Sequence, residues 1–422
     1  MFAYYCYRVL VYLLLPFMLL LQWRKGFRNR GYWSHWGDRL GFVNVPQKNY
    51  DYWVHAVSVG EVRAAAPLIK RMLSDNPERK ILLTVSTPTG RDTVDLLLKD
   101  SVDVCYMPYD VGFATRLFLQ RTQPKVAVIL ETEVWPNLIV KAQKMDIPLL
   151  YINVRLSERS FKRYQSMASF SRMVFSRIDY FAIQSASDAA RVHQLGVPLE
   201  KFSITGNIKF DVQMPASLAE SAQGLRGLLT QQRTVWIAGS TREGEEELLL
   251  QIYQNLKTDH PDLLLVIVPR HPERFDSVAK LCQKHSLQCV RRTENPMAIE
   301  AEVDVYLGDT MGELSLMYAA ADIAFVGGSL VPFGGQNILE PCALGIPVLF
   351  GPHMFNFEEI SALTIEAGAG IQVLDPQGLQ KQLQELIQRP NKRDEMGSKG
   401  KALIEEHKGA LERIYQLVVD LD

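Results

Sequence analysis

Short apolar runs rich in β-branched residues alternate with longer amphipathic stretches from residue 52 onward. Runs of this kind are typical of strands buried in a parallel sheet, and the amphipathic stretches are typical of helices that cover its faces. In the first half, strands are predicted at residues 52–57, 81–85, 102–107, 126–130, 149–153, 180–184 and 202–205. In the second half, they are predicted at residues 235–239, 263–268, 288–290, 303–307, 323–326 and 347–349. The alternation predicts an α/β fold.

The length of 422 residues suggests two or three domains at roughly 150 residues each. Residues 215–232 are rich in Ala, Ser, Gly and Gln and show no strand pattern, so they mark the predicted boundary. The Lys- and Glu-rich tail from Leu379 onward is typical of surface helix. We therefore expect an anchor helix over residues 1–23, a first domain over 24–214 and a second domain over 215–422.

The N-terminus carries an apolar segment. Residues 9–21 hold no charge, and counting back to Phe2 the apolar stretch reaches 20 residues, the approximate length of a spanning helix. It lacks a small-residue cleavage site, and basic residues follow it at once: Arg24, Lys25, Arg28 and Arg30. These charges favour a cytoplasmic location for the following domains, against anionic lipid. A buried core helix is disfavoured because no second segment is comparably apolar, whereas spanning and interfacial placements both stay open.

Composition narrows the function classes. The net charge of −1 divides into +6 over residues 1–48 and −7 over the remainder, so no general footprint for nucleic acid exists. With 47% hydrophobic and 22% charged residues, neither long disorder nor a polytopic membrane fold is expected. The five cysteines show no paired spacing and fit a reducing compartment. The eight histidines form no ligand motif, so no dedicated metal site is predicted.

Polar residues follow several predicted strands of the first half, where parallel sheets bind ligands. Glu61 opens a helix after Gly60, and it is either a complement to the helix dipole or a general base. Glu131 and Glu133 stand two residues apart after a buried strand, where they need a cation, hydroxyl partners or a chemical task. Lys209 lies at the domain hinge and could meet an anion. The turns at residues 84–91 and 153–160 fit helix capping as well as substrate contact.

The second half offers anion-binding features. Arg270 ends a predicted strand, where a guanidinium suits a phosphate or a carboxylate. Glycine-bearing turns follow at residues 239–246, 308–313 and 327–329, although Glu245 to Glu247 fit simple partners of a helix dipole. Glu340 is expected one turn into a helix, where its carboxylate could accept hydrogen bonds from a ribose diol. No GxGxxG follows a strand and no GxxxxGK[ST] occurs, which disfavours dinucleotide dehydrogenases and P-loop enzymes.

An ordered set of motifs is more specific than any single turn. The set comprises HAVSVGEV, TPTG, ETEVWPNL, NVRLSERS, TGNIKFD, GSTREGEEE, PRHPERF, GDTMGEL and GGSLVPFGGQNILEP. With the N-terminal anchor, it resembles the 3-deoxy-D-manno-octulosonic acid (Kdo) transferase family from the anchor to about Gly370. The resemblance implies a GT-B glycosyltransferase with two Rossmann-like domains facing a cleft. It further implies inverting transfer of Kdo from CMP-Kdo to the tetraacyldisaccharide 4'-phosphate precursor of lipid A (lipid IVA), at the cytoplasmic face of the Gram-negative inner membrane, without a cofactor or metal.

The resemblance also implies residue roles. Glu61 matches the family's general base, and Glu131 and Lys209 match residues that stabilise the transition state. Three segments match those that bind CMP, and their residues are Pro269, Arg270, Met311, Gly312, Glu313, Asn337, Ile338, Leu339 and Glu340. Arg242 departs from the pattern because the family commonly has His there, so an extra cation near the donor is expected.

Two other interpretations fit parts of the sequence. A GT-B-like sugar-nucleotide epimerase shares the two-domain architecture and the late Glu-Pro motif, but its soluble substrate gives no reason for an anchor. A membrane-tethered protein that only binds nucleotide leaves Glu61 and Glu131 without a task. Partners expected from the favoured interpretation are CMP-Kdo, the lipid A precursor and the anionic membrane surface.

Overall fold

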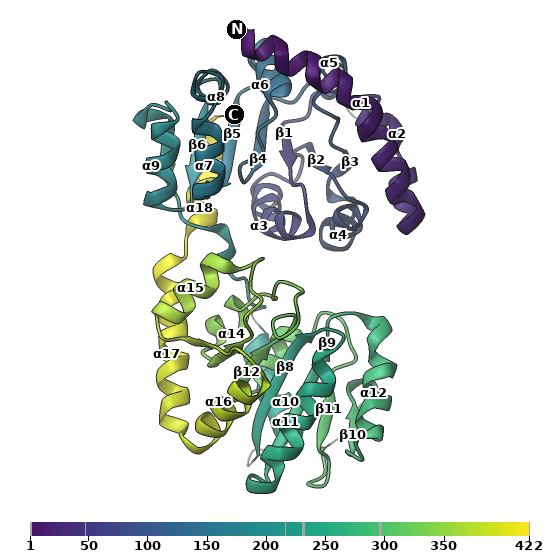
Figure 1. The fold of residues 1–422 in the computed structure, drawn as a ribbon, viewed down its shortest axis with the longest axis vertical. Helices are drawn as coiled ribbons and strands as arrows, with labels where there is room; N and C mark the ends of the chain where they lie inside the picture. The colour runs from purple at the N-terminus through teal and green to yellow at the C-terminus, as the bar shows by residue number, and fades with distance from the viewer. Residues whose placement is uncertain (1, 47, 216, 230–232, 295–297, 422) are drawn as a thin grey trace. The chain divides into compact units, whose positions relative to one another are not determined.

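The computed structural model describes all residues except 1, 47, 216, 230–232, 295–297 and 422. The chain forms two compact units, each built around its own sheet (Figure 1). Unit 1 comprises Met1–Asp211 together with Lys408–Asp422, and unit 2 comprises Val212–His407. The chain therefore passes between the units twice.

Unit 1 contains a sheet of seven parallel strands in the order β3-β2-β1-β4-β5-β6-β7. The strands are β1 Tyr52–His55, β2 Ile81–Val85, β3 Asp103–Tyr106, β4 Val126–Leu130, β5 Leu149–Val154, β6 Tyr180–Ile183 and β7 Phe202–Ile204. Successive side chains of a strand point to opposite faces of the sheet, and in the inner strands the side chains on both faces are buried. In β1, Tyr52 and Val54 enter one apolar cluster and Trp53 enters the other.

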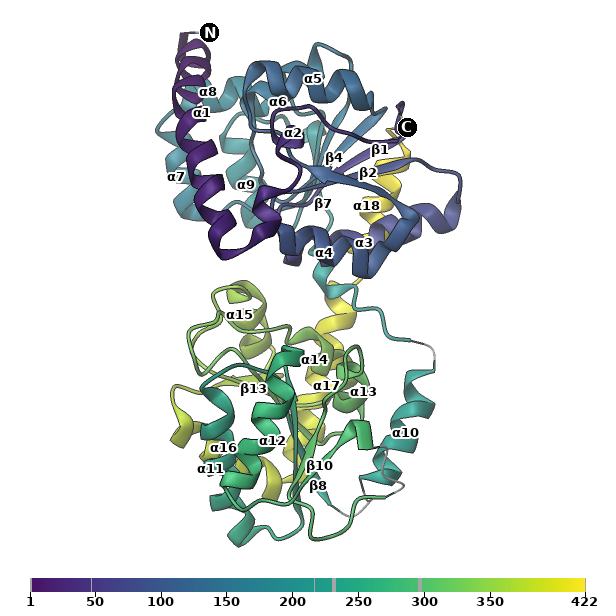
Figure 2. The same cartoon turned by 90° about the vertical axis from the view of Figure 1, so that its right-hand side faces the viewer.

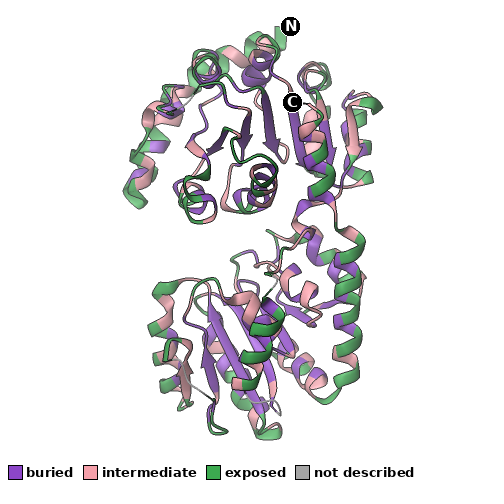
Figure 3. Cartoon of the chain, turned by 180° about the vertical axis from the view of Figure 1, so that it is seen from behind, coloured by how far each residue is buried: buried purple, intermediate pink, exposed green. Residues whose placement is uncertain are grey.

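Helices cover both faces of this sheet. The face that holds Val54 is covered by α3 Val59–Asp75, α4 Pro88–Leu98 and α18 Ala410–Val419. The face that holds Trp53 is covered by α5 Gly112–Thr122, α6 Pro136–Gln143, α8 Ala168–Phe175 and α9 Ala186–Gln194. The remaining helices are α1 Phe2–Arg28, α2 Trp36–Arg39 and α7 Glu158–Gln165. The burial colours of Figure 3 show the strands as the buried centre of each unit.

Unit 2 repeats the design with seven parallel strands in the order β10-β11-β9-β8-β12-β13-β14. They are β8 Thr234–Thr241, β9 Leu263–Pro269, β10 Cys289–Arg291, β11 Val305–Leu307, β12 Ile323–Val326, β13 Val348–Phe350 and β14 Gly370–Gln372. The helices are α10 Leu218–Leu228, α11 Glu245–Asp259, α12 Phe275–Lys284, α13 Leu314–Ala319, α14 Leu339–Leu344, α15 Glu358–Glu366, α16 Pro376–Gln388 and α17 Pro390–His407. The core on one face packs α11, α12 and α16 against the sheet (Figure 2).

The predicted α/β architecture is confirmed. All thirteen predicted strands are present, with ends that differ by at most two residues. The prediction missed β14, a three-residue edge strand between Ala369 and Val373 that begins at a glycine. Such a short segment carries too little hydrophobic pattern to be distinguished from a loop.

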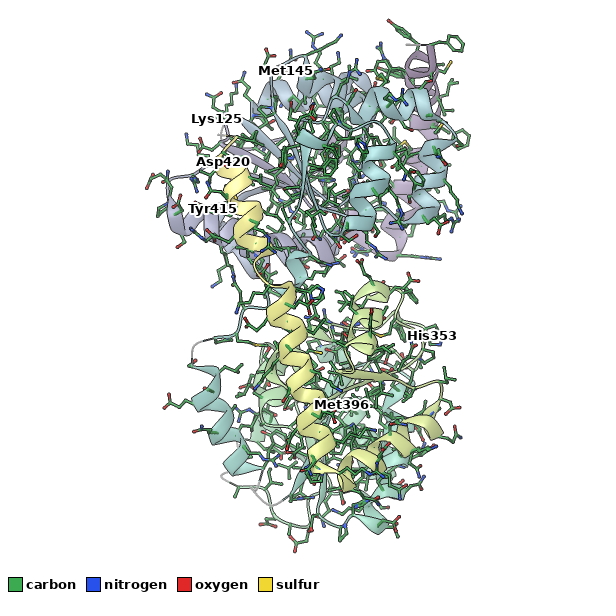
Figure 4. All side chains as sticks on the ribbon, turned by 90° about the vertical axis from the view of Figure 1, so that its left-hand side faces the viewer. Lys125, Met145, His353, Met396, Tyr415 and Asp420 are labelled. Atoms are coloured by element: carbon green, nitrogen blue, oxygen red, sulfur yellow. The ribbon has the colours of Figure 1, made fainter. Side chains whose placement is uncertain are left out.

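The ends of unit 2 differ from the expected domain division. The predicted boundary at residues 215–232 contains α10, which buries Leu218, Ala222 and Leu225. The tail, expected to be surface helix in the second domain, returns to unit 1 at Lys408. There α18 buries Ile414 and Val418 in the core of unit 1. Figure 4 labels Tyr415 on this helix, Asp420 directly after it and Met396 on α17 of unit 2.

Contacts between α18 and α3 explain this return. The Asp211 carboxylate accepts hydrogen bonds from the backbone N–H groups of Gly409 (2.6 Å) and Leu411 (2.7 Å), at the start of α18. Arg71 of α3 forms an ion pair with Glu412 (3.1 Å), and its guanidinium lies 4.2 Å from the ring centroid of Tyr415. The helix thus completes one face of the unit 1 sheet.

The predicted anchor is the single helix α1, which continues five residues beyond the expected end, to Arg28. It is long and apolar enough to cross a membrane, and only 6% of its most apolar window is buried. A core helix is therefore ruled out for this segment, as the sequence indicated. One stripe of the helix nevertheless contacts unit 1: the Tyr7 hydroxyl donates a hydrogen bond to Asp110 (2.7 Å), and the rings of Tyr12 and Phe113 lie 6.3 Å apart.

Candidate active site

Both sheets have a topological switch point, where connections leave in opposite directions. It falls between β1 and β4 in unit 1 and between β8 and β12 in unit 2. The loops at the carboxyl ends of such strand pairs diverge, and this leaves a crevice in which open α/β sheets bind ligands. The residues predicted as catalytic follow β1, β4 and β7, whereas most predicted donor-binding residues follow strands of unit 2.

Glu61 lies in the first turn of α3, directly after β1. Ser58 caps the helix, and its hydroxyl donates a hydrogen bond to Glu61 Oε1 (3.0 Å) and accepts one from the Glu61 N–H (3.4 Å). The other carboxylate oxygen, Oε2, accepts from the Val57 N–H (2.8 Å). Glu61 is 8% exposed, so these bonds hold its carboxylate in one orientation with little access to water.

The environment of Glu61 favours its protonated form. Burial raises the pKa of this carboxyl to about 7, and the negative charges of Glu131 and Glu133 add to the effect. The hydrogen bonds from Val57 and Ser58 act in the opposite direction but do not cancel it. A carboxylate that exchanges its proton near neutral pH has the property required of a general base.

Glu131 follows β4, the sheet neighbour of β1, so it stands beside the start of α3. Its backbone is left-handed (φ 57°), and its N–H donates to the carbonyl of Ile152 on β5 (2.8 Å). A non-glycine residue in this conformation carries strain, which is often found where a side chain must be aimed. Glu131 Oε1 lies 3.5 Å from Lys209 Nζ. Burial raises the pKa of the neighbouring Glu133 carboxyl, and the negative charge of Glu131 raises it further.

Lys209 sits on a short 3-10 turn, Ile208–Phe210, after β7. Asn207 Oδ1 accepts the Lys209 N–H (3.0 Å), and the fully buried Asn153 accepts the N–H of Ile208 through Oδ1 (3.1 Å). Asn153 is also left-handed (φ 54°). The sequence indicated helix capping or substrate contact for the turn that Asn153 opens, so the part of Asn153 in orienting the lysine segment was missed. The structure thus places Lys209 beside Glu131, whose charge also acts on Glu61.

In unit 2, Glu245 organises the switch point. Its carboxylate accepts four backbone N–H groups: Arg242 (3.0 Å) and Gly328 (2.6 Å) through Oε2, and Ser329 and Leu330 (2.9 Å each) through Oε1. It is fully buried and ties the loop after β8 to the loop after β12. The expected role, a simple partner of the helix dipole, is therefore incomplete.

The predicted donor segments 311–313 and 337–340 lie close to each other. Glu340 accepts hydrogen bonds from Asn337 Nδ2 (3.1 Å) and from the hydroxyl of Ser315 (3.2 Å), which follows the first segment. Glu340 is the second residue of α14, so it lies in the first turn rather than one turn in. Glu313 forms a two-bond ion pair with Arg292 (3.0 and 3.1 Å), and these hydrogen bonds lower the pKa of its carboxyl.

The other predicted donor residues differ in accessibility. Met311 is 58% exposed, and Gly312 is left-handed (φ 85°) with open space around it. Pro269, Ile338 and Leu339 are buried, so their side chains pack in the protein and only their backbones could contact a ligand. The Arg270 N–H donates to the carbonyl of Thr241 (3.0 Å), which places it beside the loop after β8.

Arg242 occupies this same loop. Its guanidinium forms a hydrogen bond with His271 Nε2 and lies 5.2 Å from the ring centroid of Phe333. Burial and the positive charges of Arg242 and Arg270 lower the pKa of His271, so its imidazole is neutral and accepts the bond. Within the part of the chain that the structure describes, no three His, Cys, Asp or Glu side chains are grouped as metal ligands.

Comparisons with known proteins agree with this architecture. Residues 34–212 match the family described as 3-deoxy-D-manno-octulosonic-acid transferase, and residues 241–403 match glycosyl transferases group 1. A crystal structure of UDP-GlcNAc 2-epimerase from Neisseria meningitidis is similar in fold (TM-score 0.52) at 15% identity, and it covers 87% of this chain and 99% of that one. Since that identity is low, the similarity concerns the fold alone. The two-sheet architecture and both family matches define a glycosyltransferase of the GT-B type.

Full-length relatives narrow the class. The chain is 39% identical to the 3-deoxy-D-manno-octulosonic acid transferase of Haemophilus influenzae, over 98% of this chain and 97% of that protein. It is 34% identical to the transferase of the same description from Bordetella pertussis, over 96% of both. The chain belongs to the 3-deoxy-D-manno-octulosonic acid (Kdo) transferase family.

Proposed function

We propose that this enzyme transfers Kdo from CMP-Kdo to the tetraacylated lipid A precursor, lipid IVA, with inversion at the anomeric carbon. The observation that supports it most directly is Glu61, a buried carboxyl with a pKa of about 7 beside the Glu131–Lys209 ion pair at the switch point. Glu61 accepts the proton of an acceptor hydroxyl as that oxygen attacks the anomeric carbon. The bond from this carbon to the CMP phosphate breaks, and its electron pair leaves on the phosphate oxygen.

Glu131 and Lys209 are proposed to stabilise charges of opposite sign in the transition state. Positive charge grows on the sugar as CMP departs, and a nearby carboxylate such as Glu131 stabilises it. Lys209 Nζ, held 3.5 Å from Glu131, meets the departing phosphate or the carboxylate of Kdo. The left-handed backbone at Glu131 and the Asn153 bond to Ile208 support this assignment because both fix the direction of these side chains.

Unit 2 is proposed to bind the CMP moiety. Arg270 suits the phosphate, and Glu340, whose two oxygens each accept one bond within the protein, keeps lone pairs for a ribose diol. CMP leaves as a phosphate monoester, whose charge a few cationic groups and backbone N–H groups can stabilise. We therefore propose a mechanism that needs no metal and no cofactor, in which activity persists in the presence of a chelator.

A lipid acceptor would explain why the chain carries the apolar helix α1. A lipid embedded in a bilayer is accessible to an enzyme that stays at that surface, and the apolar face of α1 with the basic residues after it suits an anionic membrane. The relatives from Haemophilus and Bordetella are proteins of Gram-negative bacteria. We propose that the enzyme works at the cytoplasmic face of the inner membrane.

The decisive variant is Glu61→Gln, which keeps the shape of the side chain and removes its basicity. Removing a general base lowers kcat by roughly 10²- to 10⁴-fold. Transfer is measured by mass analysis of product from CMP-Kdo and lipid IVA, and donor binding by calorimetry with CMP. We expect the loss in transfer with CMP affinity unchanged.

Glu200→Gln is the matched control because this glutamate is exposed in unit 1, away from the switch point. It should retain full activity. Substantial residual transfer by Glu61→Gln would falsify the base assignment. Transfer to an acceptor other than a lipid A precursor, with Glu61 still required, would leave the base in place but change the acceptor.

A further inference from the structure

A small cavity lies between α1, α6 and α8, outside the site described above. It has a volume of about 150 Å³, and four cationic side chains line it: Arg8 of α1, Lys141 and Lys144 of the α6 segment, and Arg177 after α8. At roughly 30 Å³ per water molecule, this is room for about five waters, enough for a phosphate group.

A buried carboxylate, Asp110, lies near the cavity, but it bonds the Tyr7 hydroxyl and the backbone N–H groups at the start of α6. Among the residues that the structure describes, none of the four cations forms an ion pair with a carboxylate. Burial lowers the pKa of Lys141, and the positive charges of Lys144, Arg116 and Arg8 lower it further. Like charges gathered without a counterion repel one another, and an anion placed among them removes that repulsion.

The neighbourhood of the cavity is apolar and faces outward. Along α1, every third or fourth residue from Tyr4 to Gly26 is at least partly buried. The opposite face carries large exposed side chains, among them Leu13 (67%) and Phe17 (65%). In both Figure 1 and Figure 2, α1 lies along the side of unit 1. An apolar helix face next to a cationic cavity matches the boundary between acyl chains and phosphate headgroups.

The cavity is separated from the catalytic residues by the sheet. Helix α6 leads from the carboxyl end of β4 to the amino end of β5, so Lys141 and Lys144 lie at the amino edge. Arg177 precedes β6 at that same edge. Glu61 follows the carboxyl end of β1 and so lies at the opposite edge. A phosphate bound among these cations is therefore not part of the sugar that reacts at Glu61.

We propose that this cavity binds the phosphodiester headgroup of an anionic membrane lipid that is not the substrate, while the outer face of α1 enters the acyl region. Helix α1 contacts the rest of unit 1 toward both ends, through Tyr7 with Asp110 and through Gln22 with Tyr32, so in this proposal the helix lies in the plane of the interface. The lipid phosphate then fixes the end of α1 that carries Arg8.

The test uses the full chain and vesicles of phosphatidylcholine with and without phosphatidylglycerol, in the absence of donor and acceptor. Lys141→Gln/Lys144→Gln should lower partition to the phosphatidylglycerol vesicles by roughly thirtyfold, since each lysine near an anionic surface contributes about 1 kcal/mol. Binding to phosphatidylcholine should not change. Gln143→Glu, which adds a carboxylate at the cavity, should weaken the same binding. Circular dichroism of both variants checks that they are folded.

Lys70→Gln/Lys280→Gln is the matched control because it removes two exposed lysines elsewhere. It should bind phosphatidylglycerol vesicles like wild type. Equal losses in both double variants mean a general charge effect and overturn the proposal, as does no loss in either. Inorganic phosphate at matched ionic strength should displace the wild type no more than chloride does. Stronger displacement by phosphate, dependent on Lys141 and Lys144, assigns the cavity to free phosphate instead of lipid. Because neither substrate is present, failure here leaves the proposed Kdo transfer untouched.

Discussion

The two switch points share one topology but differ in the partners that their buried carboxylates have. In unit 1, Glu61 and Glu133 are crowded near Glu131, and burial raises the pKa of both. In unit 2, Glu245 accepts four backbone N–H groups, and hydrogen bonds from Arg292 lower the pKa of Glu313. Burial raises the pKa of Glu246 as well, but this carboxylate is paired with Arg274 (3.2 Å). Carboxylates that resist ionisation can take a proton, whereas fully bonded ones hold loops in place. On this basis we propose that unit 1 carries the proton transfer and that unit 2 positions the donor.

The largest expected effect tests the structural half of this comparison. Glu245→Ala leaves four backbone N–H groups near the unit 2 switch point without their acceptor. The free energy of unfolding should fall by about 3–5 kcal/mol, as for other buried charged networks that lose one partner. Urea titration measures the loss, and hydrogen exchange should locate it at residues 328–330. An unchanged stability contradicts the role given to Glu245.

The next effect tests the chemical half. Lys209→Met keeps the length of the side chain and removes its charge, so the leaving phosphate or the Kdo carboxylate loses a cation. We expect kcat to fall by roughly 10²- to 10³-fold with little change in stability. Steady-state kinetics with CMP-Kdo provides the measurement, and Lys70→Met, at an exposed position of α3, serves as a control with full turnover. A change confined to KM would make Lys209 a binding residue only.

A pH-dependent effect on stability separates the two kinds of carboxylate. The folded-state pKa of Glu61 is about 7 against an ordinary 4.5, so ionisation opposes folding. This cost is absent below the ordinary pKa, grows between the two values and is complete above about pH 7. Glu61→Gln should therefore be more stable than wild type by about 1–3 kcal/mol at about pH 8, and equally stable near pH 4.5. Thermal unfolding of both proteins at the two pH values measures this difference in stability. A difference of equal size at both pH values would contradict the ionisation of Glu61 as its cause.

The same pKa sets the expected activity profile. Glu61 must be deprotonated to act as a base, so kcat/KM should rise with pH around about 7. A profile that falls across this range argues for an acid rather than a base at this position.

The smallest expected effect concerns Arg242. Its guanidinium bonds the neutral His271 and lies over Phe333, so it supports the loop after β8 rather than the reacting groups. Arg242→His should change the affinity for CMP by only a few fold, as expected for a partly exposed charge. A loss above a hundredfold would show that this cation contacts the donor directly.

The sequence predicted the strands well because doubly buried parallel strands are continuous apolar runs, a local property. It also indicated Glu61, Glu131 and Lys209, since charged residues at strand ends are visible in the chain. It missed the organising role of Glu245 because that carboxylate bonds residues more than 80 positions away. The same reason hid Asn153 and the return of α18, whose partners on α3 lie 341 residues earlier. Contacts between residues far apart in the sequence produce no periodic pattern of hydrophobic and polar residues from which they could be predicted.

The return of α18 also orders events during synthesis. Residues 408–422 are synthesised after unit 2, yet they supply Ile414 and Val418 to the core of unit 1, whose other residues are synthesised before unit 2. Unit 1 must therefore wait, with one face of its sheet incompletely covered, until unit 2 has been translated. Arrested chains that end at residue 407 should be cleaved by protease in unit 1 more readily than full chains. Because α1 precedes the sheet of unit 1 in the chain, it can reach a membrane before the unit that holds Glu61, Glu131 and Lys209 is finished.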